Sequence, residues 1–149
     1  MLQIPPMPDS AVLLDVLVSV NRLHSTLQQR VMEMLGSTGL SIAQWLLLCH
    51  LRHAAVGTLT EIAVTLHRDI GGLSRAAHRL QLRRLISVTR GAEDRRSVRL
   101  SISAPGIALC ELLDQQIAER LTSALIASMG LQSVHALRHL MEGAAASLT

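Results

Sequence analysis

Aromatic residues are almost absent from this sequence of 149 residues, which contains one Trp and neither Phe nor Tyr. The hydrophobic core must therefore be built from aliphatic side chains and methionine. Lysine is absent too, so all 14 basic residues are arginines. The length is sufficient for one domain with a core of its own.

Long apolar runs are also missing. Although 49% of the residues are hydrophobic, no stretch offers 18 uninterrupted apolar residues, so no membrane span is expected. The first ten residues lack the basic start of a signal peptide, and Asp9 and Asp15 interrupt the apolar run. We therefore expect a cytoplasmic protein, and we assign the excess apolar surface to a subunit interface.

The net charge of +3 is unevenly distributed along the chain. Residues 68–99 contain nine arginines against Asp69, Glu93 and Asp94, which leaves this segment at +6 and the remainder at −3. A basic segment joined to a mildly acidic remainder is typical of a protein that binds a polyanion on one face.

Residues 85–102 have the pattern of a β-hairpin with an arginine-rich tip. Apolar and polar residues alternate along its second arm, as in a half-buried strand: Val98, Arg99, Leu100, Ser101 and Ile102. Asp94 and Arg96 would share one face with Arg95 opposite, so the carboxylate can fix the guanidinium of Arg96. A fixed arginine suits the narrow minor groove of DNA. The alternative is a solvated hairpin whose charges keep a sheet edge soluble.

Two short helices are predicted before the hairpin, over residues 59–66 and 70–85. Helix, turn, helix and basic hairpin is the order of a winged helix-turn-helix, and here the sequence resembles the MarR family of bacterial transcriptional regulators. The resemblance covers roughly residues 10–145. The motifs that carry it are Leu59-Thr60-Glu61-Ile62-Ala63, Ser74-Arg75, Arg79-Leu80, Leu85-Ile86, Asp94-Arg95-Arg96-Ser97-Val98 and Pro105-Gly106.

This resemblance implies a mainly α fold with a small β-wing, made of six helices in a single domain over residues 1–149. Residues 41–102 would form the DNA-binding unit, whereas residues 10–35 and 104–147 would be dimerisation helices. The implied function is a homodimeric repressor that binds a pseudo-palindromic operator in double-stranded DNA and is released by a small-molecule effector. Half-sites would lie about 10 bp apart.

Capping residues predict where individual helices begin. The predicted N-caps are Ser10, Ser41, Thr60, Asp69 and Ser103. Thr58-Leu59 is predicted to be a short strand that pairs with the hairpin, and Gly130 is predicted to break the long helix that follows Ser103. In the second helix, the residues predicted to face inward are Trp45, Leu46, Leu48, Cys49 and Leu51.

The helix after Asp69 is the predicted recognition helix. By the resemblance, the residues that face the major groove are Gly71, Gly72, Ser74 and Arg75. Arg75 can bind guanine through two hydrogen bonds, and Arg79 lies on the same outward face. Two glycines stand where the family usually has polar side chains, and each costs about 1 kcal/mol of helix propensity. They keep open a second hypothesis, a winged-helix protein-interaction module without sequence-specific DNA binding.

Other candidate DNA contacts lie outside this helix: Arg68, Arg90, Asp94, Arg95 and Arg96. Arg83 and Arg84 are interpreted as phosphate contacts or as partners of the negative end of the helix dipole. Arg84 also stands where the family usually has a glycine that closes the recognition helix, which leaves the geometry of the turn into the hairpin open.

No cofactor, metal or catalytic residue is predicted. No nucleophile and base are suitably spaced, and the glycines do not fit a phosphate-binding loop, so the chain is interpreted as non-enzymatic. The pairs His50/His53 and His135/His139 have metal-ligand spacing but no neighbouring third ligand, so they are interpreted as solvated or core histidines.

Cys49 and Cys110 lie in apolar helical patterns. The peroxide-sensing branch of the family uses a thiol near the start of the first helix with tyrosine partners, and this chain has neither. We therefore expect both cysteines to be small core residues without an activating partner. The resemblance also places an effector pocket between the dimerisation helices and the DNA-binding unit, with His24, Trp45 and His53 as candidate lining residues.

Overall fold

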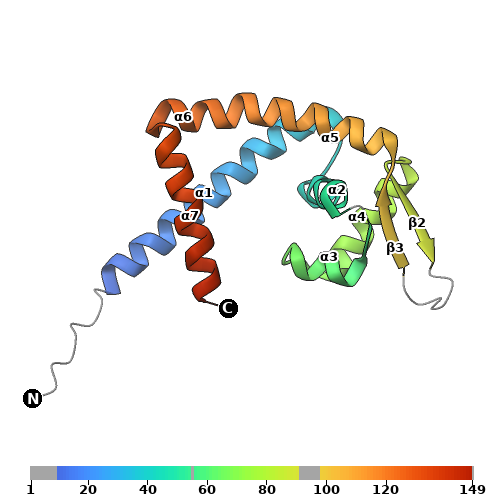
Figure 1. Cartoon of the computed structure of the whole chain (residues 1–149), viewed down its shortest axis with the longest axis horizontal. Helices are drawn as coiled ribbons and strands as arrows, with labels where there is room; N and C mark the ends of the chain where they lie inside the picture. Colours follow the sequence, from blue (N-terminus) through green and yellow to red (C-terminus); the bar gives the residue numbers. More distant parts are fainter. Residues whose placement is uncertain (1–9, 55, 91–97, 149) are drawn as a thin grey trace, which may run out of the picture. The chain divides into compact units, whose positions relative to one another are not determined.

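The structure is a computed structural model that describes residues 10–54, 56–90 and 98–148 (Figure 1). The chain divides into two compact units, residues 1–42 and 43–149, and each is described by itself. The sequence prediction of a mainly helical fold with a small β-wing is confirmed.

The first unit is dominated by helix α1 (Ser10–Leu35), followed by the short 3₁₀ helix η1 (Gly36–Thr38). The bounds predicted for this long helix are confirmed. Val31 and Leu35 near its end are buried, but the apolar side chains of its first half are exposed: Val12, Leu13, Leu14, Val16, Leu17, Val18 and Val20. An apolar surface of this extent on a single helix is typical of an interaction face.

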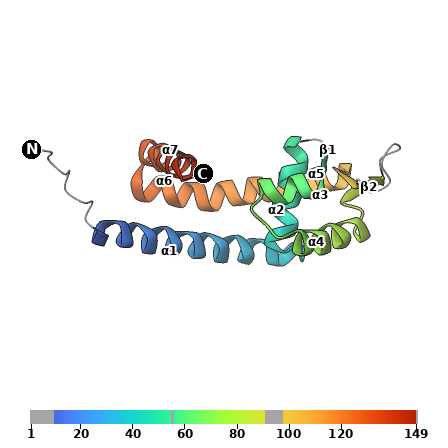
Figure 2. The same ribbon diagram turned by 90° about the horizontal axis from the view of Figure 1, so that it is seen from below.

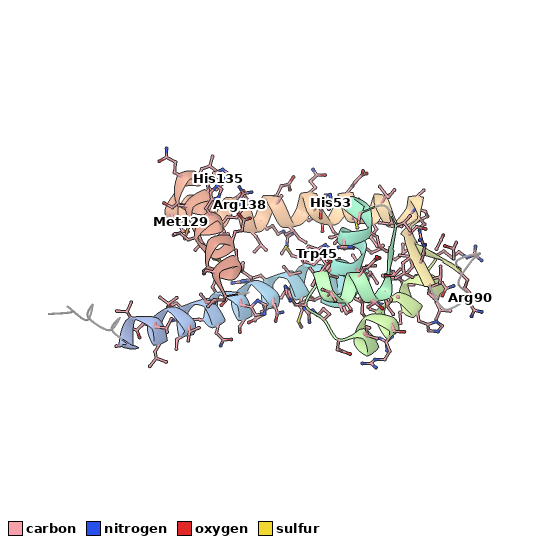
Figure 3. All side chains as sticks on the ribbon, turned by 60° about the horizontal axis from the view of Figure 1, so that its bottom comes forward. Trp45, His53, Arg90, Met129, His135 and Arg138 are labelled. Carbon is pink, nitrogen blue, oxygen red and sulfur yellow. The ribbon has the colours of Figure 1, made fainter. Side chains whose placement is uncertain are left out.

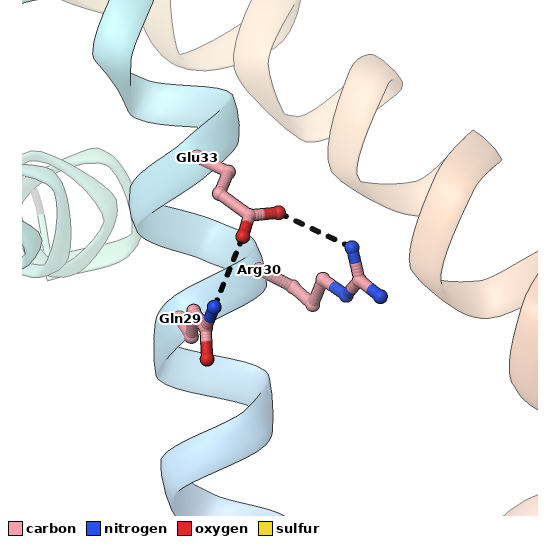
Figure 4. Close-up of polar contacts among 3 residues, drawn as sticks. All are labelled: Gln29, Arg30 and Glu33. Atoms are coloured by element: carbon pink, nitrogen blue, oxygen red, sulfur yellow. Dashed lines mark hydrogen bonds and ion pairs between the residues drawn. The ribbon is translucent and has the colours of Figure 1, made fainter.

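The second half of α1 carries a small polar network on its exposed surface (Figure 4). The carboxylate of Glu33 accepts a hydrogen bond from the amide of Gln29 at 3.3 Å and pairs with the Arg30 guanidinium at 3.3 Å. Exposed pairs one helical turn apart stabilise a helix by only about 0.3–0.5 kcal/mol. The network therefore marks the solvated side of α1 rather than a source of fold stability.

The second unit contains the winged helix and the last helices. Its elements in chain order are α2 (Ile42–Ala54), β1 (Val56–Thr58), α3 (Leu59–Thr65), α4 (Ile70–Leu82), β2 (Ile86–Arg90), β3 (Val98–Ile102), α5 (Ala104–Ile117), the π-helical segment η2 (Ala118–Thr122), α6 (Ser123–Met129) and α7 (Leu131–Ser147).

The three strands form an antiparallel sheet in the order β1-β3-β2, so the predicted hairpin of β2 and β3 is confirmed. Leu100 lies opposite both Val88 and Gly57, and it is almost fully buried together with Ile86. The alternation seen in the sequence thus separates a buried face of the wing from an exposed one.

The start of α3 corrects one predicted cap. Thr58, not Thr60, is the N-cap: its hydroxyl accepts from the backbone N–H of Glu61 at 3.3 Å, and the Glu61 carboxylate accepts from the backbone N–H of Thr58 at 2.9 Å. This reciprocal capping box satisfies two backbone donors at once, which Thr60 could not do from inside the helix. The predicted strand is correspondingly shifted, since β1 ends at Thr58 and Leu59 begins α3.

Helices α3 and α4 end in the same way, with a non-glycine residue in the left-handed conformation. His67 has φ 48° and Arg84 has φ 57°. At the end of α4, the N–H of Arg84 donates to the Gln81 carbonyl at 2.9 Å, and the N–H of Leu85 donates to the Leu80 carbonyl at 3.0 Å. This is the Schellman pattern, whose left-handed position is usually glycine because a side chain is strained there.

The junction between α4 and α5 is held by backbone carbonyls at this helix end. Ser103, the predicted and observed N-cap of α5, donates its hydroxyl to the Arg84 carbonyl at 2.8 Å and its N–H to the Leu85 carbonyl at 3.1 Å. Its hydroxyl also accepts from the Gly106 N–H at 3.2 Å. A Cβ atom on Gly106 would overlap the Leu85 carbonyl oxygen, so only glycine allows this approach.

The buried face of α2 is rotated from the predicted one. Leu48 and Leu51 are buried as expected, whereas Trp45, Leu46 and Cys49 are only half-buried. The other buried positions of this helix are Gln44 and Leu47. Hydrophobicity alone favours Trp45 over Gln44 as the buried residue, so the buried side of α2 does not follow from hydrophobicity.

Helices α5 and α6 run through η2 as one rod, and α7 leaves it after Gly130, which has φ 80° (Figure 2). Apolar side chains on this last region are also exposed, among them Leu131, Leu140 and Met141. No single helix among the described residues is long and apolar enough to cross a membrane. One bent pair of helical segments, Ala11–Thr38 and Ile42–Ala54, is long and apolar enough when the two are taken together, by length and composition only.

The strain at Arg84 gives a first prediction. Arg84→Gly should raise the free energy of unfolding by about 1 kcal/mol, because glycine adopts positive φ without steric cost. Arg83→Gly is the matched control, since Arg83 has φ −84° and loses the same charge from the same helix end. That control should lower the free energy by about 0.5 kcal/mol. Urea denaturation of both variants tests the pair, and equal effects would contradict the assignment of strain to Arg84.

Candidate nucleic-acid interface

Helix α4 separates a buried apolar face from an exposed polar face. The predicted inward residues are all buried: Leu73, Ala76, Ala77 and Leu80. The opposite side exposes Ser74, Arg75, His78 and Arg79. Because the buried face packs against α3 and β2, the polar face is held at a fixed position on the surface of the unit.

The N-terminus of α4 is capped by Asp69, as the sequence predicts. Its carboxylate accepts a hydrogen bond from the Gly72 N–H at 2.6 Å. A Cβ on Gly72 would lie only 2.7 Å from the other carboxylate oxygen, so glycine leaves room for this cap. Gly71 and Gly72 lie within the regular helix, which begins at Ile70.

Gly71 also leaves room for the side chain of Arg75, one turn further along. A Cβ at Gly71 would lie 3.5 Å from the Arg75 guanidinium and 3.3 Å from the Asp69 carboxylate. The guanidinium of Arg75 is thus directed towards the N-terminal end of α4. The helix dipole gives that end a positive partial charge, which attracts phosphate groups.

Among the described residues, two carboxylates in α3 and at the start of α4, those of Glu61 and Asp69, take part in helix capping. Hydrogen bonds from the backbone N–H and the hydroxyl of Thr58 lower the pKa of Glu61, with a further contribution from the charge of Arg99. Asp69 caps α4. Among the described residues, neither Arg75 nor Arg79 forms an ion pair with a carboxylate. Their charges therefore remain available to an external anion.

On the hairpin, Arg90 ends β2 and is exposed (Figure 3). Arg99 lies opposite Thr89 on β3 and is exposed as well, so it joins the candidate contacts although the sequence-based set omitted it. The alternation of the strand was the signal that could have identified it. Asp94, Arg95 and Arg96 lie outside the described residues, and their roles remain predictions.

Between α3 and α4 the surface forms an open hollow. It is lined by Thr60, Ala63, Val64, His67, Arg68 and Ile70. Val64 is 71% exposed and Ile70 is 49% exposed, so apolar groups reach the surface beside the predicted DNA contact Arg68. None of the candidate effector residues lines this hollow.

The three candidate effector residues have different surroundings. His24 on α1 and His53 on α2 are exposed, whereas Trp45 on α2 is half-buried (Figure 3). The indole Nε1 of Trp45 is buried and has no hydrogen-bond partner among the described residues. Within that part of the chain, no group of three or more His, Cys, Asp or Glu residues could hold a metal ion.

The chain is similar in sequence to known proteins. The model of the MarR family matches residues 40–98. The multiple antibiotic resistance protein MarR of Escherichia coli strain K12 is 26% identical over 140 residues, which span 91% of this chain and 97% of that protein.

Solved structures of such proteins have the same fold. A mutant MarR from E. coli complexed with operator DNA superposes with a TM-score of 0.73 at 25% identity, over 87% of this chain and 96% of that one. BpsR of Bordetella bronchiseptica, whose DNA binding is regulated by 6-hydroxynicotinic acid, gives a TM-score of 0.73 at 22% identity, over 85% and 89%. At this lower identity the likeness concerns the fold alone.

The two glycines of α4 give a second prediction. Gly71→Ala and Gly72→Ala should gain the same helix propensity of about 1 kcal/mol. Gly72→Ala displaces the Asp69 carboxylate further, because a Cβ there would lie 2.7 Å from a carboxylate oxygen against 3.3 Å at Gly71, and this should remove a cap worth about 1 kcal/mol. In thermal or urea unfolding, Gly71→Ala should therefore be the more stable variant by about 1 kcal/mol. If Asp69→Ala removed this difference, the cap would be confirmed as its cause; equal stability of the two alanine variants would contradict it.

Proposed function

We propose that the chain is a member of the MarR family of winged helix-turn-helix regulators and that it acts as a homodimeric DNA-binding transcriptional regulator. Each protomer presents α4 to the major groove of double-stranded DNA and its hairpin to the adjoining minor groove. We further propose repression as the mode of regulation.

The observation that carries this proposal is the exposed face of α4. The opposite side of this helix is buried in the core, whereas its exposed side carries Ser74, Arg75 and Arg79. Arg75 is the proposed base contact, because a guanidinium can donate two hydrogen bonds to guanine. Gly71 and Gly72 allow close approach of the helix backbone to the DNA, so they contribute shape rather than side-chain contacts.

The remaining arginines are proposed to bind phosphates or the minor groove. Arg68, Arg90 and Arg99 are exposed at different points around α4. Sequence-based reasoning adds the hairpin residues Asp94, Arg95 and Arg96, with Asp94 orienting Arg96. Phosphate contacts set register and affinity, whereas base contacts set sequence preference. We therefore propose that α4 sets the preference for a DNA sequence, whereas the wing contributes binding that is largely independent of sequence.

The domain organisation is proposed as it was predicted from the sequence. Residues 41–102 form the DNA-binding unit, and residues 10–35 and 104–147 supply dimer contacts. The exposed apolar residues of α1 and α7 support this assignment, because a monomer rarely leaves such surfaces open to water. Two-fold symmetry then requires a pseudo-palindromic operator with half-sites about 10 bp apart.

We propose that a small-molecule effector controls release from DNA. Trp45 is the candidate with a structural reason, since a buried indole N–H without a partner can donate a hydrogen bond to a bound ligand. His24 and His53 remain candidates by family resemblance only. We also propose that the chain acts in the cytoplasm and has no catalytic activity.

In vitro selection of DNA from a random pool distinguishes a DNA-binding regulator from the alternative, a winged-helix protein-interaction module. Enrichment of a pseudo-palindromic sequence supports the regulator. Binding to selected and random DNA with equal affinity would instead favour the protein-interaction module without sequence-specific binding.

Substitution of single arginines should distinguish the helix from the wing. On the selected operator, Arg75→Ala should cost about 1–3 kcal/mol and relax preference at one base pair per half-site. Arg90→Ala should weaken binding to all sequences alike and lower the salt dependence by about one ion. Salt titrations on the operator and two point variants test both. If Arg75→Ala lost affinity equally on every sequence, α4 would be a phosphate anchor only.

The dimer should depend on the exposed apolar face of α1. Leu17→Asp should shift the protein to monomer at micromolar concentration, because a charge would be buried without a partner in the interface. Ser25→Asp is the control, since it adds the same charge at an exposed polar position of the same helix. Sedimentation velocity measures the outcome. A dimeric Leu17→Asp variant would show that this face is not the interface.

A further inference from the structure

An ion pair connects the first helix of the winged-helix region to α5. The guanidinium of Arg52 on α2 pairs with the carboxylate of Asp114 on α5, and both residues belong to the second unit. The two side chains expose 24% and 35% of their surface, so the pair is partly shielded from water. The pair Arg30–Glu33, by contrast, lies within α1 and is more exposed. The Arg52–Asp114 pair therefore cross-links two elements that are far apart in the sequence.

Helix α5 has another attachment at its start, where the Gly106 backbone lies against the Leu85 carbonyl. Asp114 follows eight residues later, which places it about 12 Å further along the helix. Between the two points lie Cys110 and Leu113, both fully buried. These positions recur at intervals of three or four residues, so they share one face of α5. The ion pair thus lies at the far end of the face that α5 buries against the rest of the unit.

Two attachments fix the direction of a helix, whereas one attachment acts as a pivot. A contact at Gly106 alone would let the rest of α5 tilt about that point. The buried apolar side chains oppose a tilt only weakly, because apolar contacts have no preferred direction. The pairing of a guanidinium with a carboxylate does have a preferred geometry. The Arg52–Asp114 pair therefore opposes a change in the angle between α2 and α5.

A small change in this angle is amplified along the rod formed by α5, η2 and α6 (Figure 2). Met129, at the end of the rod, lies about 35 Å from Gly106. A tilt of about 5° would displace that end by about 3 Å over this length. One base pair of DNA rises about 3.4 Å along the duplex axis. A tilt of a few degrees in each protomer is therefore enough to change the spacing of two recognition helices by about one base pair.

We propose that Arg52 and Asp114 are positioning residues that set the half-site spacing accepted by the dimer. This inference rests on the proposed function, because it concerns how a DNA-binding dimer places its two α4 helices. The pair acts through the angle between α2 and α5, and it contacts neither the DNA nor an effector. Loss of the pair leaves each recognition helix intact but weakens the selection of one operator length.

Three DNA duplexes test this role with the full-length protein. They are the operator obtained by in vitro selection, the same operator with one base pair inserted between its half-sites, and a single half-site. The ratio of the affinities for the first two measures discrimination by spacing. Arg52→Gln and Asp114→Asn should each lower this ratio by roughly fivefold, the lower end of typical coupling between two sites. Neither should change the affinity for the single half-site. Fluorescence anisotropy measures all three affinities.

Two further variants separate the ion pair from the charges themselves. The double variant Arg52→Asp with Asp114→Arg restores a pair of opposite charges, so it should recover much of the wild-type ratio. Glu111→Gln is the matched control for Asp114→Asn, because it removes one negative charge from an exposed position of the same helix. Its ratio should equal that of the wild type. A double variant no better than the two single variants would overturn the role of the ion pair.

Other outcomes also contradict the proposal. An unchanged ratio in both single variants would overturn it. An equal loss of affinity for the operator and for the single half-site would overturn it as well, because a general loosening of the fold, and not a change of spacing, would then be the cause. A wild-type protein that binds the operator no better than random DNA would instead contradict the proposed function, on which this inference rests.

Discussion

Two consecutive carbonyls, those of Arg84 and Leu85, bind the end of α4 to the start of α5 and to the base of the hairpin. Ser103 donates to both carbonyls, and Gly106 allows the α5 backbone to approach them. The exposed face of α4 and the hairpin strands are therefore held in a fixed position relative to each other within the unit. A site that combines a helix and a hairpin on one duplex depends on that relation, since the two grooves have a fixed spacing.

The fold was largely predictable where the decisive interactions span three or four residues. The caps at Asp69 and Ser103, the buried stripe of α4 and the alternation of β3 follow from local patterns. The cap of α3 was missed although Thr58 and Glu61 have capping-box spacing. The buried face of α2 could not be predicted, because it depends on which neighbours pack against that helix and not on its own sequence.

The candidate site also has features that could be predicted from the sequence and features that could not. Exposed arginines on α4 and the hairpin follow from periodicity, and the family resemblance assigns them to DNA. The position of the Arg75 guanidinium beside Gly71 could be seen only in the structure, as could the ion pair between Arg52 on α2 and Asp114 on α5. This ion pair joins two segments that are far apart in the sequence, and no local signal predicts which side chains will meet across such a distance. Arg84 is a mixed case. Its place in the sequence was noticed because the family usually has a glycine there, but its left-handed conformation could be seen only in the structure.

The π-helical segment η2 changes the helical phase of the rod from α5 to α6. The buried residues Cys110 and Leu113 are three apart, whereas the half-buried Ile117, Leu121 and Leu125 follow at intervals of four. Four residues overshoot a turn of α-helix but fall short of a turn of π-helix, so the wider turn keeps these side chains in line. One residue gained or lost within η2 would rotate every later side chain by about 100° about the rod axis. The length of this short segment thus sets the direction in which the whole C-terminal apolar surface faces.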